Sequence, residues 1–250
     1  MVFNLTTRTR RAVAALLVAG VVGGTAAGGV AGALGGGQSA QAQRPAAAQV
    51  AVAKSTVPKP LTRADTAAED VIGFLEKGRP AKSKAEARVL RELAHGKAAD
   101  VLRGTGVSRE RIRMFQQRAD RTASLSLADA PALAVSQAAN SVSQLMPGFY
   151  ARYQDPVPAA VLRLDYLDRQ VQLDSQAGQR VKLSETVRKL AATWLELRPQ
   201  LVAAGGTSVA RAYDAHVAAL ERGGTTTAVQ KQAVHGLDLV DRMEGVFLGK

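Results

Sequence analysis

One stretch of the chain carries an apolar residue at every third or fourth position. Its members are Leu183, Val187, Leu190, Trp194, Leu197 and Leu201. This spacing places all six side chains on one face of an α-helix. A helix with one apolar face must bury that face against another element. The stretch therefore predicts a packed helix in which Trp194 anchors the core, or alternatively forms the aromatic wall of a ligand pocket.

The same helical period recurs along the rest of the chain, and no segment alternates as a strand would. After Asp129, an expected N-cap before Pro131, the apolar stripes are regular and the connections are short, with Pro147 expected to break or kink one helix. We therefore predict an all-α fold with an antiparallel up-and-down bundle over residues 128–250. Residues 61–127 are predicted to form additional amino-terminal helices. One of them is expected to begin at the capping box Ser83-x-x-Glu86, and another at Ser108.

The first 42 residues have the pattern of an export signal. Arginines near the start precede a run from residue 12 to 37 that has no charge, and Ala40 and Ala42 provide an A-x-A cleavage site. The run is also long enough to span a bilayer, so an uncleaved anchor remains the alternative. Residues 43–60 are rich in Ala and Pro and are predicted to be a flexible linker. We expect the mature protein to be secreted or extracytoplasmic, in the cell envelope of a bacterium.

Composition limits the available chemistry. The chain has no cysteine, which excludes disulfides, thiol catalysis and Cys-ligated zinc. It also contains no Gly-rich phosphate loop, no G-x-S-x-G and no H-E-x-x-H. No nucleophile and base are visible, and no complete metal set, so we predict that the protein is not an enzyme.

The most polar run on a core helix is Asp165-Tyr166-Leu167-Asp168-Arg169. Asp165 and Asp168 share a helix face and could offer two carboxylates to a cation, or they could lie on a salt-bridged outer face. His216 falls in the middle of its own apolar stripe. It could be a ligand or a base that faces the bundle centre, or equally a histidine at the edge of the core that is bonded to a neighbour. Oxygen ligands favour a hard divalent cation, and adding His216 would admit iron, zinc or copper. Asp165, Asp168 and His216 are therefore the candidate metal ligands. The i, i+3 spacing of His235 and Asp238 could also hold a metal, but these two are expected to face solvent.

The most basic stretch of the mature chain runs from Arg103 to Arg121. The formal net charge of the whole chain is +12. Within the stretch, Arg109, Arg111, Arg113 and Arg118 are candidates for docking to an anionic surface such as a membrane or an envelope polymer. A solvated helix face is the alternative. Phe115 is the only aromatic residue there, so no specific nucleic-acid binding is expected, and anchoring in the membrane is expected only through an uncleaved signal segment.

Part of the second half resembles the helical repeats of imelysin-like extracytoplasmic proteins, which belong to bacterial iron-uptake systems. The resemblance rests on Trp194-Leu195-Glu196-Leu197-Arg198-Pro199, on Gly205-Gly206 and on Ala212-Tyr213-Asp214-Ala215-His216-Val217. It implies a helical bundle in a metal-related setting. The His-x-x-Glu motif of that family is absent, and the nearest match is His235-x-x-Asp238, so no ligand carries over.

Two functions from different classes follow. The first is a secreted, non-enzymatic bundle that binds a cation or a small ligand. The second is a structural or adaptor bundle that docks to an anionic envelope surface or to a protein partner.

Overall fold

The structure, a computed structural model, describes residues 56–250 of the chain. The predicted signal segment lies outside the described residues, as does all of the predicted linker before residue 56; the last two linker residues already belong to a helix. No β-strand occurs in the described part, where one isolated bridge pairs Thr56 with Gln154. The all-α prediction is confirmed. In the same residues, no helix is long and apolar enough to cross a membrane.

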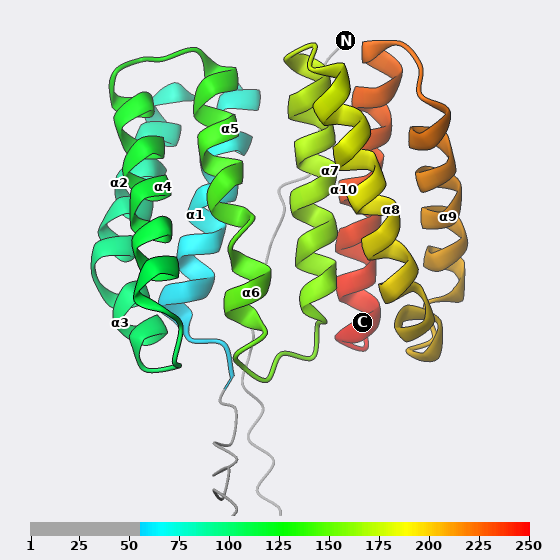
Figure 1. The fold of residues 1–250 in the computed structure, drawn as a ribbon, viewed down its shortest axis with the longest axis horizontal. Coiled ribbons are helices and arrows are strands. Elements are labelled where there is room, and N and C mark those ends of the chain that lie inside the picture. The colour runs from blue at the N-terminus through cyan, green and yellow to red at the C-terminus, as the bar shows by residue number, and fades with distance from the viewer. Residues whose placement is uncertain (1–55) are drawn as a thin grey trace, which may run out of the picture. The chain divides into compact units, whose positions relative to one another are not determined.

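Ten helices make up the described part of the chain (Figure 1). They are α1 (Lys59–Glu76), α2 (Pro80–His95), α3 (Lys97–Arg103), α4 (Arg109–Leu127), α5 (Ala132–Ser143), α6 (Met146–Tyr150), α7 (Ala159–Gln176), α8 (Arg180–Ala203), α9 (Thr207–Arg222) and α10 (Thr226–Phe247).

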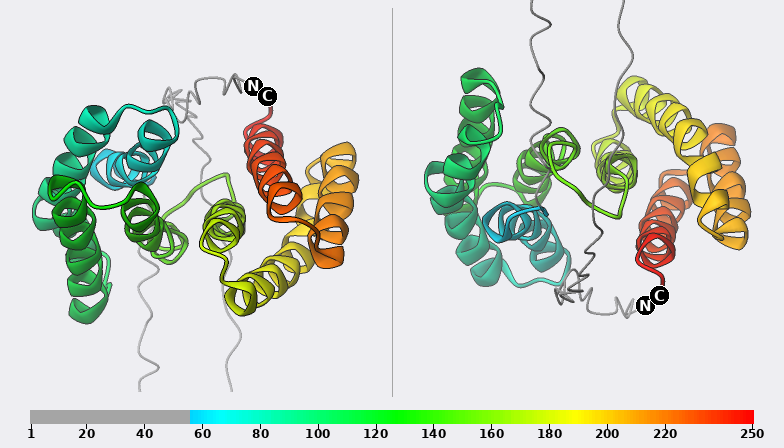
Figure 2. Two further views of the ribbon diagram at one scale, coloured as in Figure 1. Left: turned by 90° about the horizontal axis from the view of Figure 1, so that it is seen from above. Right: turned by 90° about the horizontal axis from the view of Figure 1, so that it is seen from below.

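The helices pack in two groups of four, seen nearly end-on in Figure 2. In the first group α1 contacts α2 and α5, and α4 contacts α2 and α5. In the second group α8 and α10 both contact α7 and α9. The short helix α6 and the helix α5 both pack against α7, which joins the two groups. The up-and-down topology and the boundary at residue 128 stay predictions; α5, which follows that boundary, packs on α1 and α4.

A continuous apolar core runs through both groups. It extends from Leu61 and Leu90 in the first group, past Phe149 and Tyr153, to Leu190 and Val240 in the second. Its side chains are mostly Ala, Val and Leu, and small side chains let helices approach closely. Trp194 is 2% exposed and belongs to this core, as the stripe on α8 predicts.

Local signals set some helix boundaries but not others. Ser108 caps α4 as predicted, because its side chain accepts a hydrogen bond from the amide of Arg111. The helix breaks just before Pro147, as predicted: α5 ends at Ser143, and Pro147 is the second residue of α6. The capping box at Ser83 is wrong: α2 begins at Pro80, and Ser83 Oγ donates to the carbonyl oxygen of Val71 from inside the helix.

The expected N-cap at Asp129 is also wrong. Pro131 precedes the first residue of α5, and Asp129 lies outside the helix with a positive φ of 53°. Its carboxylate pairs with Lys84 Nζ at 2.7 Å. Asp129 therefore forms part of the turn between α4 and α5.

Candidate functional site

The most polar feature of the interior is a cluster formed by Asp168 on α7 and by Tyr213 and His216 on α9. His216 Nε2 lies 2.8 Å from Asp168 Oδ1, and Tyr213 Oη donates to Asp168 Oδ2 at 2.7 Å. The side chains of Asp168 and His216 are fully buried. Tyr213 and His216 are three residues apart on α9, so both reach the same facing carboxylate. We call these three residues the buried cluster.

Burial changes the proton affinities in the buried cluster. The pKa of Asp168 is raised, first because burial disfavours the charged carboxylate; the hydrogen bond from His216 opposes this, and the nearby charge of Asp165 adds to it. The pKa of Tyr213 is raised well above its ordinary value, again first by burial and then by the charge of Asp168. The cluster is therefore held together by hydrogen bonds in a site that penalises charge.

Two further side chains and one glycine lie against the buried cluster. The ring centroids of Trp194 and Tyr213 are 4.7 Å apart, and those of His235 and His216 are 6.3 Å apart. On α10, Gly236 comes so close that a Cβ at that position would lie 2.3 Å from Asp168 Oδ1. His216 Nδ1 is buried and has no hydrogen-bond partner among the described residues.

The alternative that placed the polar run of α7 on an outer face is wrong. Asp165 and Arg169 are each 5% exposed and Asp168 is 0% exposed. The reason is the position of α7, which contacts α5, α6, α8 and α10 and so has little free surface. The spacing of residues along α7 could not indicate that its polar run is buried. A helix that joins two groups is buried on most of its circumference, and this depends on its neighbours.

The structure brings Asp168 and His216 together, as the metal hypothesis requires. The two side chains, however, are hydrogen-bonded to each other. Both carboxylate oxygens of Asp168 already accept hydrogen bonds at 2.7–2.8 Å. Within residues 56–250, no group of three or more His, Asp or Glu side chains is arranged to hold a metal ion. His235 and Asp238 are both exposed, as expected. The assignment of Asp165, Asp168 and His216 as metal ligands stays a prediction.

The four candidate arginines of α4 fall into two pairs. Arg118 is half-buried and donates to the carbonyl oxygen of Ser141 and, at 2.8 Å, to Gln144 Oε1, so it ties α4 to α5. Arg111 lies over the ring of Phe149 on α6, with its guanidinium carbon 5.6 Å from the ring centroid. Arg109 and Arg113 are exposed and form no ion pair with any described residue. Of the four arginines, these two are the ones that are exposed and have no partner within residues 56–250.

A second polar contact links α8 and α9 near the surface. Asp214 accepts a hydrogen bond from Trp194 Nε1 at 2.8 Å and from Arg198 Nε and Nη2, both at 2.9 Å. The hydrogen bond from Arg198 is the main reason that the pKa of Asp214 is lowered. Trp194, Arg198 and Asp214 all belong to the stretches that resemble imelysin-like repeats. This contact gives all three a structural role.

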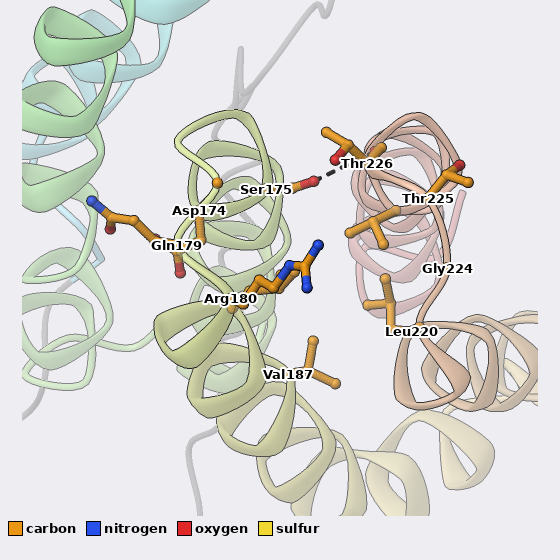
Figure 3. Close-up of a pocket in the computed structure, with 13 residues that line it drawn as sticks. Asp174, Ser175, Gln179, Arg180, Val187, Leu220, Gly224, Thr225 and Thr226 are labelled. Carbon is orange, nitrogen blue, oxygen red and sulfur yellow. Dashed lines mark hydrogen bonds between the residues drawn. The ribbon is translucent and has the colours of Figure 1, made fainter.

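The described residues also form a pocket of about 790 Å³ at one end of the second group (Figure 3). It lies where the loop between α7 and α8 faces the loop between α9 and α10. Its apolar walls are Leu183, Val187, Leu220 and Val229. Figure 3 shows the side chain of Arg180 reaching from the start of α8 across this space toward Leu220 and Thr226.

The polar side chains that line this pocket differ in whether they already have hydrogen-bond or ion-pair partners among the described residues. Asp174 is 1% exposed and accepts hydrogen bonds from Gln170 and from Thr186 Oγ1, each at 2.8 Å. Thr225 caps α10 through the amide of Ala228. Arg180 forms no ion pair with any described residue, so its charge is available to a ligand.

No protein-family model, curated protein or solved structure matches this chain. The resemblance to imelysin-like proteins therefore stays a prediction.

Sequence reasoning missed three of these features. It did not find Tyr213 as the second donor to Asp168, the close approach of Gly236, or the role of Arg180 in the pocket. The signal for Gly236 was present, because a glycine inside a regular apolar stripe indicates close helix packing. For Arg180 there was no signal, because the pocket forms between two loops that are distant in sequence.

Proposed function

We propose that this chain is a non-enzymatic binding protein of the cell envelope that takes a small amphipathic anion in the pocket beside Arg180. The observation that carries the proposal is the combination of four apolar walls with one guanidinium, which forms no ion pair among the described residues, in a space of about 790 Å³. Ligand sites in proteins usually have volumes of about 300–1,000 Å³, apolar walls and a few polar groups that orient the ligand. Arginine binds carboxylates well because its planar fork can donate two parallel hydrogen bonds.

The geometry of the buried cluster favours binding over catalysis. A carboxylate bonded to an imidazole is the arrangement here that most resembles catalytic machinery. Both side chains are fully buried, so a substrate would have no access to them. The pocket beside Arg180, in contrast, is accessible from solvent and contains no histidine. The location in the cell envelope rests on the export signal expected from residues 1–42.

Binding of decanoate tests the proposal, with decanol as a matched neutral probe. We expect decanoate to raise the melting temperature of the protein, because a ligand that binds only the folded state stabilises it by about 2.7 kcal/mol at 100 times its Kd. Decanol should bind more weakly. Arg180→Gln should weaken decanoate binding about tenfold or more, while Arg211→Gln, an exposed change on α9, should leave it unaltered. Equal binding of both probes, or no effect of Arg180→Gln, would count against the proposal.

A second candidate function is supported by the uneven distribution of charge. Residues 56–127 contain 15 Lys and Arg against 9 Asp and Glu, whereas residues 128–250 contain 13 against 12. The excess of positive charge therefore belongs to the first group of helices, where Arg109 and Arg113 are exposed. A net positive charge of this kind attracts anionic surfaces at low salt.

Co-sedimentation with vesicles of anionic phosphatidylglycerol tests this second function. Binding should fall as salt is raised, and the double variant Arg109→Gln/Arg113→Gln should bind less than the wild type. The matched control is Arg211→Gln/Arg222→Gln, which removes the same charge from the exposed side of α9. If both double variants lose the same amount of binding, net charge alone is responsible and no surface on α4 is involved.

A further inference from the structure

Helix α8 carries large apolar side chains that no other described part of the chain covers. Val181, Leu195 and Val202 are 75%, 70% and 37% exposed, and they are the exposed large apolar residues of the described part. They are separated by 14 and 7 residues, which places them on one side of the helix. Figure 2 shows α8 at the outside of the second group. The opposite side of α8 is the buried stripe that includes Leu190 and Leu197.

The exposed side of α8 is flanked by charges that have no partner in the described chain. Lys189 and Glu196 are both exposed, and neither forms an ion pair with any described residue. At 100° per residue they lie on the same flank of the apolar side, seven residues apart. This separation is too long for a pair within one helix, where charges three or four residues apart interact. Ala192 is exposed midway between them.

We propose that this side of α8 docks antiparallel against the same side of α8 in a second copy of the chain. In such a twofold pair centred beside Ala192, Glu196 of each copy lies opposite Lys189 of the partner subunit, so that two equivalent ion pairs form. In a parallel twofold pair, the flank that carries Lys189 and Glu196 would lie on opposite sides of the contact in the two copies, so neither ion pair could form. Self-complementary charge is the reason for choosing a second copy as the occupant.

The central residue permits the close approach that this pairing needs. Helices packed at small residues approach to about 8 Å between their axes. With Ala192 at the centre, Leu195 of one copy packs beside the partner subunit's Arg188, whose methylene stem is apolar. A contact through one helix pair buries less than the roughly 1,600 Å² of a standard interface. The dimer should therefore depend on concentration in the micromolar range.

The absence of cysteine from the chain makes a site-specific crosslink possible. In Ala192→Cys, the two sulfurs would meet at the twofold axis, within the about 4.4–6.8 Å between Cα atoms that a disulfide spans. Mild oxidation should therefore convert this variant to a covalent dimer. Ala203→Cys is the matched control, because it is another exposed alanine of α8 but would lie about 30 Å from its copy.

A charge exchange tests the pairing independently of any crosslink. Lys189→Glu and Glu196→Lys should each weaken dimerisation about tenfold in analytical ultracentrifugation, because each opposes like charges across the interface. The double variant Lys189→Glu/Glu196→Lys should restore it, since the two pairs form again with exchanged signs. Leu195→Glu should give a monomer with unchanged helical circular dichroism.

Three results would overturn the proposal. They are a monomeric wild type at all concentrations from about 1 to 100 µM, equal crosslinking of Ala192→Cys and Ala203→Cys, and a double variant as weak as the single ones. Each result is independent of ligand binding in the pocket beside Arg180, because none of the altered residues lines that pocket.

Discussion

Gly236 on α10 leaves no room for a methyl group beside Asp168 on α7. A Cβ built at Gly236 would lie 2.3 Å from Asp168 Oδ1 and 2.5 Å from His216 Nε2. Both atoms are held by their mutual hydrogen bond, so neither can retreat without breaking it. The glycine thus sets how closely α10 approaches the buried cluster.

This contact predicts that two glycines of one helix respond to alanine with opposite signs. Within a helix, Gly→Ala ordinarily stabilises by about 0.8–1.0 kcal/mol. We expect this gain for Gly245→Ala, where nothing lies within 4 Å of the new Cβ. Gly236→Ala should instead destabilise, by about 1–3 kcal/mol, because it overpacks the core. Urea unfolding followed by circular dichroism measures both, and two values of the same sign would contradict the packing described here.

Removing the central carboxylate should be among the most costly changes in the chain. Asp168→Ala leaves Tyr213 Oη and His216 Nε2 buried without their partner, and each buried polar group left unsatisfied costs about 1–3 kcal/mol. Asp168→Asn keeps the size and an acceptor, so its loss should be smaller. Asp238→Ala, on the exposed side of α10, should stay within about 0.5 kcal/mol. Equal losses for Asp168→Ala and Asp238→Ala in denaturant unfolding would disprove a structural role for the cluster.

The raised pKa of Asp168 predicts the sign of a pH effect. A carboxyl group whose pKa is higher in the folded state than in the unfolded state holds its proton more tightly when folded. Its contribution to stability is complete below the unfolded pKa and is lost as the pH rises through the folded pKa. The stability of the wild type relative to Asp168→Asn should therefore fall as the pH is raised from about 4. Urea midpoints of both proteins over a pH series give this difference, and a rise would refute the shift.

The pKa of Asp214 is shifted in the opposite direction to that of Asp168. Its pKa is lowered chiefly by the hydrogen bond from Arg198, so Arg198→Met should raise it toward the ordinary value. Carboxyl carbon shifts in an NMR titration report this pKa directly. Arg222→Met is the control, because it removes an exposed arginine that is not in contact with Asp214. The same titration should also move the fluorescence of Trp194, whose Nε1 donates to Asp214.

Two arginines of α4 should differ sharply in their effect on stability. Arg118 donates to Ser141 and Gln144 on and just after α5, and hydrogen bonds from charged groups contribute about 1.5–3 kcal/mol. We expect Arg118→Gln to lose stability of that order. Arg113→Gln, at an exposed position five residues earlier on α4, should change the stability by less than about 0.5 kcal/mol. Thermal unfolding of the two variants distinguishes them, and similar melting temperatures would remove the structural role of Arg118.

The sequence could predict features that depend on neighbours along the chain. The stripe around Trp194, the cap at Ser108 and the break at Pro147 all depend on residues within a few positions of one another. Ser83 misled the prediction because its hydroxyl bonds to Val71 of another helix, which outweighs the local capping pattern. The local sequence pattern therefore predicts where a helix lies more reliably than it predicts where the polar side chains of that helix point.

The site required information that local pattern does not contain. His216 was expected among apolar residues, and it lies there, but the side of α7 that faces it depends on how two groups of helices share that helix. Asp168 was singled out for a cation, yet the structure gives its two oxygens to Tyr213 and His216. The pocket beside Arg180 forms between two loops, and spacing within a single helix has no bearing on it.

Because the chain has a single tryptophan, and Trp194 is buried in the second group of helices, fluorescence observes only half of the molecule. Far-ultraviolet circular dichroism, in contrast, observes every helix. If the continuous core makes both halves melt together, the two signals will trace one curve. If the contacts of α6 and α7 couple the two groups only weakly, the transition seen by fluorescence will occur at a different temperature from the one seen by circular dichroism. The two signals therefore measure the cooperativity of unfolding without any added label.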